Sequence, residues 1–235
     1  IRRPPRSTHF PYTTLFRSLA SIATAAKLTI QSKTEDMKTG FSLENTPDAK
    51  QSIAPMGLPT GTRMVVSHLF ANVPARKKFL KSDSTETQAI SRVVTDAALA
   101  HPHISFTFSK DGKTALELPS SQNILQRIHA LFGDTVSESI IPVTSTSEYA
   151  QISGFVGKPQ IARKSKNNQY LFINNRPVMS ARIAQLVKAT FGSLLEPKMH
   201  PTFMLFIDMP VDSLDVNVHP QKQTVRFVYT KEIEN

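Results

Sequence analysis

The stretch Asp215–Phe227 reads DVNVHPQKQTVRF and predicts two short strands separated by a turn. Apolar and polar residues alternate on both sides of Pro220, and proline has no N–H to donate to a strand ladder. Lys222 is therefore expected on a turn between the two strands. An ammonium group in that place is either a solvated surface charge or a partner for phosphate oxygens. The stretch alone leaves both interpretations open.

A second informative stretch, Gly61–Ser82, reads GTRMVVSHLFANVPARKKFLKS. Its β-branched run indicates a strand, and Pro74 suits the first position of a following helix. That helix is strongly basic, and its charges either form a solubilising face or serve a binding function. The basic residues are Arg76, Lys77, Lys78 and Lys81.

Taken together, the two stretches resemble the MutL family of DNA mismatch-repair proteins, which are members of the GHKL ATPases. Tyr170–Val178 (YLFINNRPV) looks like the strand and turn that lie between them in that family, and the order and spacing agree. The resemblance extends from Leu19 to Phe227. Thr224 departs from it, because relatives more often carry a glutamate there.

The composition is that of a globular protein. The chain has 235 residues, of which 40% are apolar and 20% charged, enough for one large domain or two modest ones. No run of eighteen apolar residues predicts a membrane span, and no signal peptide opens the chain. The lack of cysteine excludes a disulfide framework and fits a reducing cytoplasm. We expect no membrane partner, and the resemblance implies a cytoplasmic, nucleoid-associated bacterial protein.

The net charge of +10 favours polyanionic partners, because basic surfaces attract phosphate backbones. Part of the charge comes from Ile1–Ser18, which holds four arginines and no acidic residue; without them the net charge is +6. The segment resembles a translated sequencing adaptor, so we expect a non-native, disordered leader. A natural basic arm that binds nucleic acid is the alternative.

Hydrophobic periodicity predicts the secondary structure of most of the remaining chain. Between residues 35 and 59 only one short strand is expected, and Ser84 or Thr85 is expected to cap the helix that follows. The expected helices are Leu19–Ala26, Asp83–Ala100, Ile124–Phe132 and one capped by Ser180. The expected strands are Lys27–Thr34, Thr62–Ser67, Ser139–Val143, Tyr149–Val156, Tyr170–Ile173 and Thr202–Asp208. The expected turns are Asp111-Gly112 and Asn174-Asn175.

The predicted fold class is α+β. The resemblance implies that residues 19–119 form the C-terminal part of a GHKL ATPase α/β sandwich, and that residues 120–235 form a transducer domain. In relatives the transducer has a mixed sheet with a left-handed βαβ crossover. The hand rests on the resemblance alone, because the general rule favours right-handed crossovers.

GHKL ATPases need a carboxylate that activates water, a nearby asparagine that holds Mg²⁺ and a glycine-rich lid that binds phosphates. None of these motifs occurs in the sequence, so no catalytic or metal-binding residue is assigned. We expect the intact parent to use ATP and Mg²⁺, and this chain alone to bind neither and to be inactive. The resemblance implies two remaining nucleotide contacts: Thr62 at the adenine end of the pocket, and Lys222 reaching the γ-phosphate from the transducer.

The resemblance also implies sequence-independent contacts to DNA phosphates, homodimerisation on ATP binding and a mismatch-recognition partner of the MutS type. The candidate phosphate contacts are Arg163, Lys164, Lys166, Arg176, Arg182 and Lys188. The implied function is ATP-dependent coupling of mismatch recognition to strand incision, in a chain that is a truncated fragment of its parent.

Two alternatives remain. A non-catalytic basic module would bind nucleic acid without nucleotide, with an affinity that falls as salt rises. Another GHKL protein, such as a type II topoisomerase subunit, is disfavoured by the combination of PARKKFL with DVNVHP.

Overall fold

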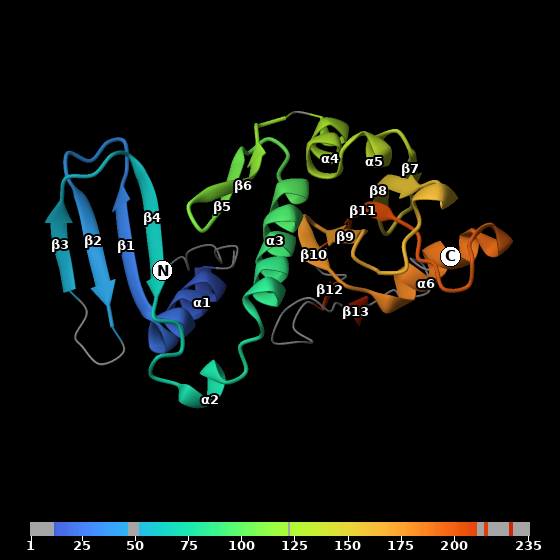
Figure 1. Cartoon of the computed structure of the whole chain (residues 1–235). Coiled ribbons are helices and arrows are strands. Elements are labelled where there is room, and N and C mark those ends of the chain that lie inside the picture. The colour runs from blue at the N-terminus through green and yellow to red at the C-terminus, as the bar shows by residue number, and fades with distance from the viewer. Residues whose placement is uncertain (1–11, 47–51, 122, 211–213, 216–225, 228–235) are drawn as a thin grey trace, which may run out of the picture. The chain divides into compact units, whose positions relative to one another are not determined.

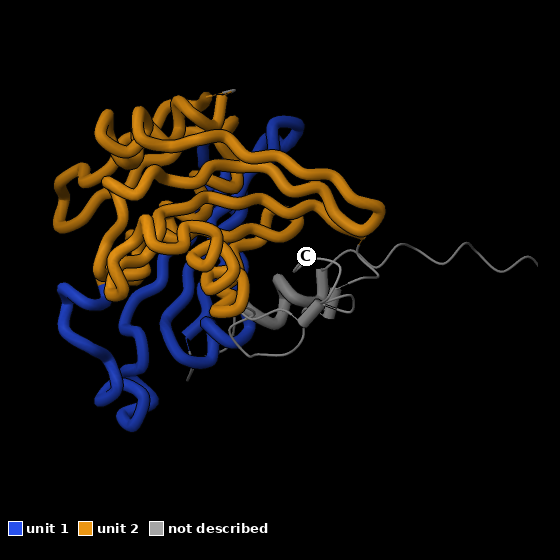
Figure 2. The backbone as a smooth tube through the Cα atoms, turned by 90° about the vertical axis from the view of Figure 1, so that its right-hand side faces the viewer, with its two compact units in different colours: residues 1–86 blue, residues 87–235 orange. Residues whose placement is uncertain are grey.

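A computed structural model describes residues 12–46, 52–121, 123–210, 214–215 and 226–227, with only the backbone described for residues 12–18, 214–215 and 226–227. The chain forms two compact units, residues 1–86 and 87–235 (Figure 2), and each is described by itself. This division by contacts lies between Glu86 and Thr87. The family-level boundary expected between residues 119 and 120 stays a prediction.

The first unit contains an antiparallel sheet with the strand order β3-β2-β1-β4 (Figure 1). Its elements are α1 (Tyr12–Ala25), β1 (Lys27–Lys33), β2 (Gly40–Asn45), β3 (Ser52–Met56), β4 (Gly61–Ser67) and α2 (Pro74–Lys77). Helix α1 begins inside the segment expected to be a disordered leader, so residues 12–18 are helical; the remainder of that segment lies outside the described residues.

Strand β3 was not expected from the sequence. It contains Pro55, which is paired with Phe41 of β2. Proline is tolerated on an edge strand because its missing N–H need not face a partner, and β3 is at the edge of this sheet. A proline in a polar stretch predicts a loop, but pairing with β2 makes this segment a strand.

The second unit contains most of α3 (Asp83–Ala100), the later helices and a five-stranded sheet. Helix α3 crosses the division between the units. The elements after it are β5 (Phe106–Lys110), β6 (Lys113–Leu118), α4 (Ile124–Phe132), α5 (Asp134–Ser137), β7 (Ile140–Thr146), β8 (Gln151–Gly157), η1 (Pro159–Ile161), β9 (Gln169–Ile173), β10 (Arg176–Val178), α6 (Ala181–Thr190), η2 (Gly192–Leu194), β11 (Phe203–Asp208), β12 (Leu214–Asp215) and β13 (Arg226–Phe227).

The five-stranded sheet is mixed, with the order β10-β9-β11-β8-β7. Strands β9 and β11 are parallel neighbours, whereas the other pairs are antiparallel. Helix α6 lies between β9 and β11 in the chain, so the predicted βαβ crossover in a mixed sheet is confirmed. The left hand of that crossover stays a prediction.

Alternation along the central strands builds a core on each face of this sheet. Leu171 and Ile173 of β9 belong to one core with Ile183 of α6. Tyr170 and Phe172 belong to the other. That second core also contains Leu99 of α3, Ile128 of α4 and Met204 of β11. The sheet is therefore covered by α6 on one face and by α3 and α4 on the other.

Several helix ends and turns follow their sequence signals. Asn123 accepts the Leu125 N–H at 2.8 Å, and Ser180 accepts the Ile183 N–H at 3.2 Å, so both cap their helices. The turns at Asp111-Gly112 and Asn174-Asn175 take positive φ values as expected. The cap expected at Ser84 or Thr85 is wrong by two or three residues: α3 begins at Asp83, and Ser82 Oγ accepts the Thr85 N–H.

Arg127 of α4 is 1% exposed and contacts two separate stretches of backbone, one before the β5–β6 hairpin and one after it. Its Nη2 atom lies 2.6–2.9 Å from the carbonyl oxygens of Pro102, Ile104 and Pro119. Its Nε and Nη1 atoms have no hydrogen-bond partner among the described residues. Burial lowers the pKa of this guanidinium. The segments that enter and leave the β5–β6 hairpin are thereby both held to α4.

None of the helices in the described residues is both long and apolar enough to cross a membrane.

Candidate nucleic-acid interface and nucleotide contacts

Thr62 is on β4, the edge strand of the first unit, and is exposed. It is paired in register with Ser32 of β1, and the two hydroxyl oxygens are 2.8 Å apart. Gly61 before it has a φ of +132°, a conformation that glycine adopts more readily than other residues. The hydroxyl is thus held at a defined place on the strand, with its second hydrogen-bonding capacity available to a ligand.

Lys222 lies outside the described residues, so its role at a γ-phosphate stays a prediction. The two ends of its stretch are described. Leu214 pairs with Phe227, and Asp215 pairs with Arg226, in an antiparallel ladder between β12 and β13. The expected pair of strands around the turn is therefore present at its base.

Three of the six candidate phosphate contacts lie on one exposed loop of the second unit. Arg163, Lys164 and Lys166 are all exposed in the segment between η1 and β9. Arg163 forms an isolated antiparallel bridge with His200, in which the two N–H···O distances are 3.0 and 2.7 Å. This bridge fixes the start of the loop to the segment that enters β11.

Lys188 reaches the same segment from α6. Its Nζ donates to the Pro197 carbonyl at 2.8 Å. The pKa of His200 is lowered by burial and then by the positive charges of Lys188 and Lys166. The two ammonium groups therefore act on one imidazole, although they come from different elements. We call Arg163, Lys164, Lys166, Lys188 and His200 the basic cluster.

The other two candidates lie elsewhere on the second unit. Arg176 begins β10 and pairs with Ile173, the last residue of β9, whereas the basic loop precedes the first residue of β9. Arg182 is exposed near the start of α6, six residues before Lys188, or about 9 Å along the helix axis. Arg176 is thus at the opposite end of β9, and Arg182 lies outside the cluster, near the other end of α6.

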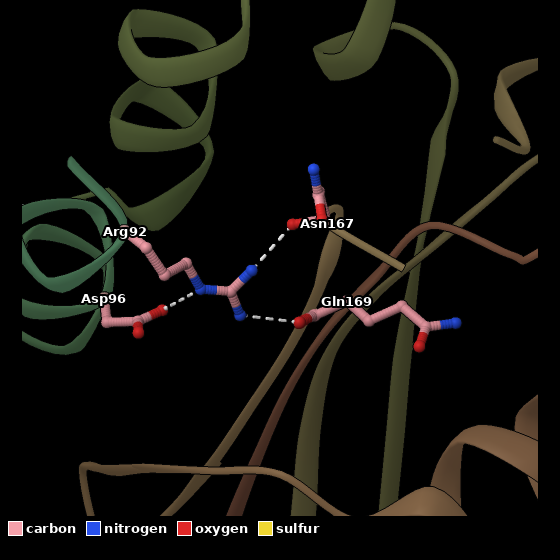
Figure 3. A network of polar contacts seen from close by, with 4 residues as sticks. All are labelled: Arg92, Asp96, Asn167 and Gln169. Carbon is pink, nitrogen blue, oxygen red and sulfur yellow. Dashed lines mark hydrogen bonds and ion pairs between the residues drawn. The ribbon is translucent and has the colours of Figure 1, made fainter. Parts of the chain in front are cut away.

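Arg92 of α3 is a residue of this region that the sequence did not point to (Figure 3). Its Nη1 donates to the Asn167 carbonyl at 2.6 Å, and its Nη2 donates to the Gln169 carbonyl at 2.7 Å. Its Nε donates to Asp96 Oδ1 at 3.0 Å, and its guanidinium lies 3.9 Å from the centre of the Tyr170 ring. The i,i+4 spacing in the sequence predicts the Arg92–Asp96 pair. The sequence contains no pattern that predicts hydrogen bonds to backbone carbonyls 75 or more residues away.

The described residues do not provide an evident site for Mg²⁺. Among them, no group of three or more histidine and acidic side chains is placed to hold a metal ion. Mg²⁺ prefers carboxylate ligands together with substrate phosphates. No chemical step is therefore assigned to a metal held by the described residues.

Comparisons with known proteins agree with this fold. The family profile described as "DNA mismatch repair protein, C-terminal domain" matches residues 128–235. A DNA mismatch repair protein MutL of Christiangramia forsetii is 39% identical over 210 residues, which cover 89% of this chain and 34% of the relative. A MutL of Neisseria meningitidis is 35% identical over 215 residues, which cover 92% and 32%. The chain spans about a third of the length of these curated relatives.

Solved structures show the same fold at lower identity. The N-terminal domain of a DNA repair protein has a TM-score of 0.78 at 22% identity, covering 92% of this chain and 71% of that one. The Aquifex aeolicus MutL ATPase domain complexed with ADP has a TM-score of 0.68 at 23% identity, covering 84% and 73%. The gyrase B-subunit of Myxococcus xanthus reaches 0.52 at 12% identity, covering 92% and 66%.

The relatives named MutL match nearly nine-tenths of the chain, and the family profile matches residues 128–235, which lie within its second unit. The chain belongs to the MutL family of DNA mismatch-repair proteins.

Proposed function

We propose that the chain is the nucleotide-responsive, DNA-contacting part of a mismatch-repair protein. In this function the second unit binds the DNA backbone through the basic cluster, and the whole protein couples mismatch recognition to strand incision with ATP. The observation that supports DNA binding best is the exposure of Arg163, Lys164 and Lys166 on one loop whose start is bridged to His200. Cations gathered at one place attract a polyanion more strongly than the same charges spread over a surface.

The cluster has the features of a phosphate-binding surface rather than a base-reading one. Its arginine and lysines are flexible side chains on a loop and near the end of one helix. Lysine acts as a point charge on phosphate oxygens, and phosphate contacts carry no sequence information directly. Binding is therefore proposed to be independent of sequence, as a repair protein that must act at any site requires.

For the nucleotide, we propose that Thr62 contacts the adenine end and that Lys222 contacts the γ-phosphate. Only ATP carries the γ-phosphate, so a lysine supplied by the second domain binds ATP more tightly than ADP. That differential affinity would bias the conformations of the protein, because a ligand shifts an equilibrium only by its preference for one state. In this proposal, ATP with Mg²⁺ drives homodimerisation, and a protein of the MutS type delivers the mismatch signal.

An ATPase assay tests the chemical part of the proposal. The sequence contains no carboxylate–asparagine helix pair and no glycine-rich lid of the family type, so residues 1–235 alone are expected to release no phosphate above background. Malachite-green detection measures this. Turnover that is lost in the variant Lys222→Ala would contradict the proposed inactivity of the chain.

Fluorescence anisotropy with a labelled DNA duplex tests the binding surface. Lys166→Gln and Lys188→Gln are each expected to weaken binding roughly fivefold to tenfold near 0.1 M salt and to reduce the salt slope by about 1. Lys113→Gln is the matched control, because Lys113 is an exposed lysine on the β5–β6 hairpin of the same unit. Equal losses of DNA affinity in all three variants would show that only net charge matters. They would contradict the proposed binding surface.

The alternative of a nucleotide-independent basic module is not favoured. The matches to MutL relatives cover about nine-tenths of the chain and include the first unit, which a free-standing nucleic-acid module would not need. Equilibrium dialysis with ATP on a protein that carries the complete N-terminal motifs separates the two functions.

A further inference from the structure

We propose that Arg92 is a positioning residue for DNA binding, which sets the place of the basic loop without touching DNA itself. The inference rests on the proposed DNA-binding function and adds a residue to it. Its basis is the set of contacts in Figure 3, which join α3 to the end of the loop that carries Arg163, Lys164 and Lys166.

The basic loop is fastened at both ends. At its start, the backbone of Arg163 is bridged to His200. At its end, the carbonyls of Asn167 and Gln169 both accept from the Arg92 guanidinium. The residues between these anchors include Lys164 and Lys166, so the anchors decide where those two ammonium groups can reach.

The guanidinium is suited to this task by its shape. Its planar fork donates in fixed directions, so two carbonyls separated by one residue can be held together, which a single ammonium does less well. Asp96 accepts from Nε at 3.0 Å and aims the group from within the same helix. The ring of Tyr170, which is 5% exposed, lies against the guanidinium and limits its hydration.

Arg92 itself is poorly placed as a phosphate contact. All three of its nitrogen atoms donate to protein oxygens, and its side chain is 35% exposed. The charge is partly balanced by Asp96, whose pKa is raised by burial and lowered in turn by Arg92. Its contribution to binding is therefore expected to pass through the loop.

The decisive variant is Arg92→Lys, because it keeps the positive charge and removes the fork. Anisotropy titrations of the full chain with a DNA duplex are expected to show binding weakened about fivefold, with a salt slope reduced as in Lys166→Gln. Arg92→Gln is expected to behave like Arg92→Lys. An affinity of Arg92→Lys equal to that of the unmodified chain overturns the inference.

A double-mutant cycle distinguishes positioning from a general loss of stability. Arg92→Lys and Lys166→Gln are expected to be coupled, so that the double variant binds no more than about twofold more weakly than Lys166→Gln alone. In the control cycle, Arg92→Lys and Lys113→Gln are expected to have independent effects. Independent effects in both cycles would show that Arg92 does not act through the loop.

The two proposals fail in distinguishable ways. If Lys166→Gln leaves DNA binding unchanged, the basic cluster is not the binding surface and the proposed function fails at its site. If Lys166→Gln weakens binding while Arg92→Lys does not, the surface stands and the positioning role is overturned. Should Arg92→Lys lose its cooperative urea transition, Asp96→Ala replaces it, since it removes the acceptor of Nε and leaves both carbonyl contacts. A smaller loss of affinity is expected, and no loss at all would overturn the inference.

Discussion

The sheets of the two units differ in how they are covered. In the first unit, all five residues of β3 and six of seven in β4 are exposed. In the second, four of five residues of β9 and four of six in β11 are buried. The buried apolar residues described in the first unit are Ala25, Ala26 and Leu28, whereas the second has a core on each face of its sheet.

This difference bears on stability, because a sheet is stabilised by what packs on its faces. The second unit buries large side chains in close contact, including Phe172, which is fully buried and stacked on Phe206 with ring centres 4.9 Å apart. The first unit offers few such contacts. We therefore expect substitutions of equal size to have very different effects in the two units.

The largest expected effect is that of Phe172→Ala, which should lower the free energy of unfolding by about 3–5 kcal/mol through lost burial and a cavity. The matched variant is Ile53→Ala on β3, whose side chain is 67% exposed; it should change stability by less than about 0.5 kcal/mol. Urea titrations followed by circular dichroism measure both. Similar losses in the two variants would break the comparison.

Glycine substitutions sharpen the contrast. Gly154 of β8 has a φ of +138°, and a Cβ there would lie 2.1 Å from the carbonyl oxygen of Met204 on the neighbouring strand. Gly154→Ala should therefore destabilise the second unit by about 3 kcal/mol. Gly57, in the first unit, has open space around it, so Gly57→Ala should be neutral or slightly stabilising. Thermal unfolding of both variants tests the pair, and a destabilised Gly57→Ala would contradict it.

Helix caps give a smaller difference. Ser180 accepts the Ile183 N–H at 3.2 Å in a partly buried place, and its replacement by alanine should cost about 1 kcal/mol. Ser82 accepts the Thr85 N–H at 3.4 Å in an exposed place, so Ser82→Ala should cost less than about 0.5 kcal/mol. Amide hydrogen exchange in the first turns of α6 and α3 reports each cap directly. A greater loss at α3 than at α6 would reverse the order expected here.

The smallest expected effect is a difference in pH dependence between two carboxyl groups. Burial raises the pKa of Asp96 above its ordinary 3.8, so the folded state holds its proton more tightly and stability falls as pH rises from the ordinary pKa through the raised one. A hydrogen bond from the Thr34 side chain lowers the pKa of the exposed Asp36, so its contribution is lost as pH falls through the lowered value.

Urea titrations between pH 3 and 7 measure the two slopes, with Asp96→Asn and Asp36→Asn as the respective controls. Each substitution should remove one slope and leave the other. A pH profile that Asp96→Asn does not alter would show that this carboxyl has the same pKa in the folded and unfolded chain.

Sequence patterns located most of the second unit. Helices α3 and α4 have the predicted bounds, and Ser180 and Asn174-Asn175 act as predicted. These signals are local: a 3.6-residue period, a capping hydroxyl and residues that tolerate positive φ. Ile90 and Val93 of α3 are exposed. The 3.6-residue period could not predict this, because exposure depends on which elements pack against the helix.

The residues that organise the candidate site were less visible. Arg92 and Arg127 are charged and read as surface residues, although both donate to backbone carbonyls distant in sequence. Arg127 did leave one signal, because it lies on the apolar face of α4 between Ile124 and Leu131. Lys166 and Lys188 were predicted as separate candidates. The hydrogen bond from Lys188 to the Pro197 carbonyl and the bridge between Arg163 and His200 required the tertiary fold.

The acceptors of the buried Arg127 are all main-chain atoms, which every amino acid supplies alike. Side chains at those three acceptor positions can therefore change during evolution without loss of the hydrogen bonds to Arg127. The arginine has no such freedom, since a shorter side chain would leave the three carbonyls without the Nη2 donor that they share. A survey of natural variants should find tolerance at the acceptor positions and strict retention of the donor.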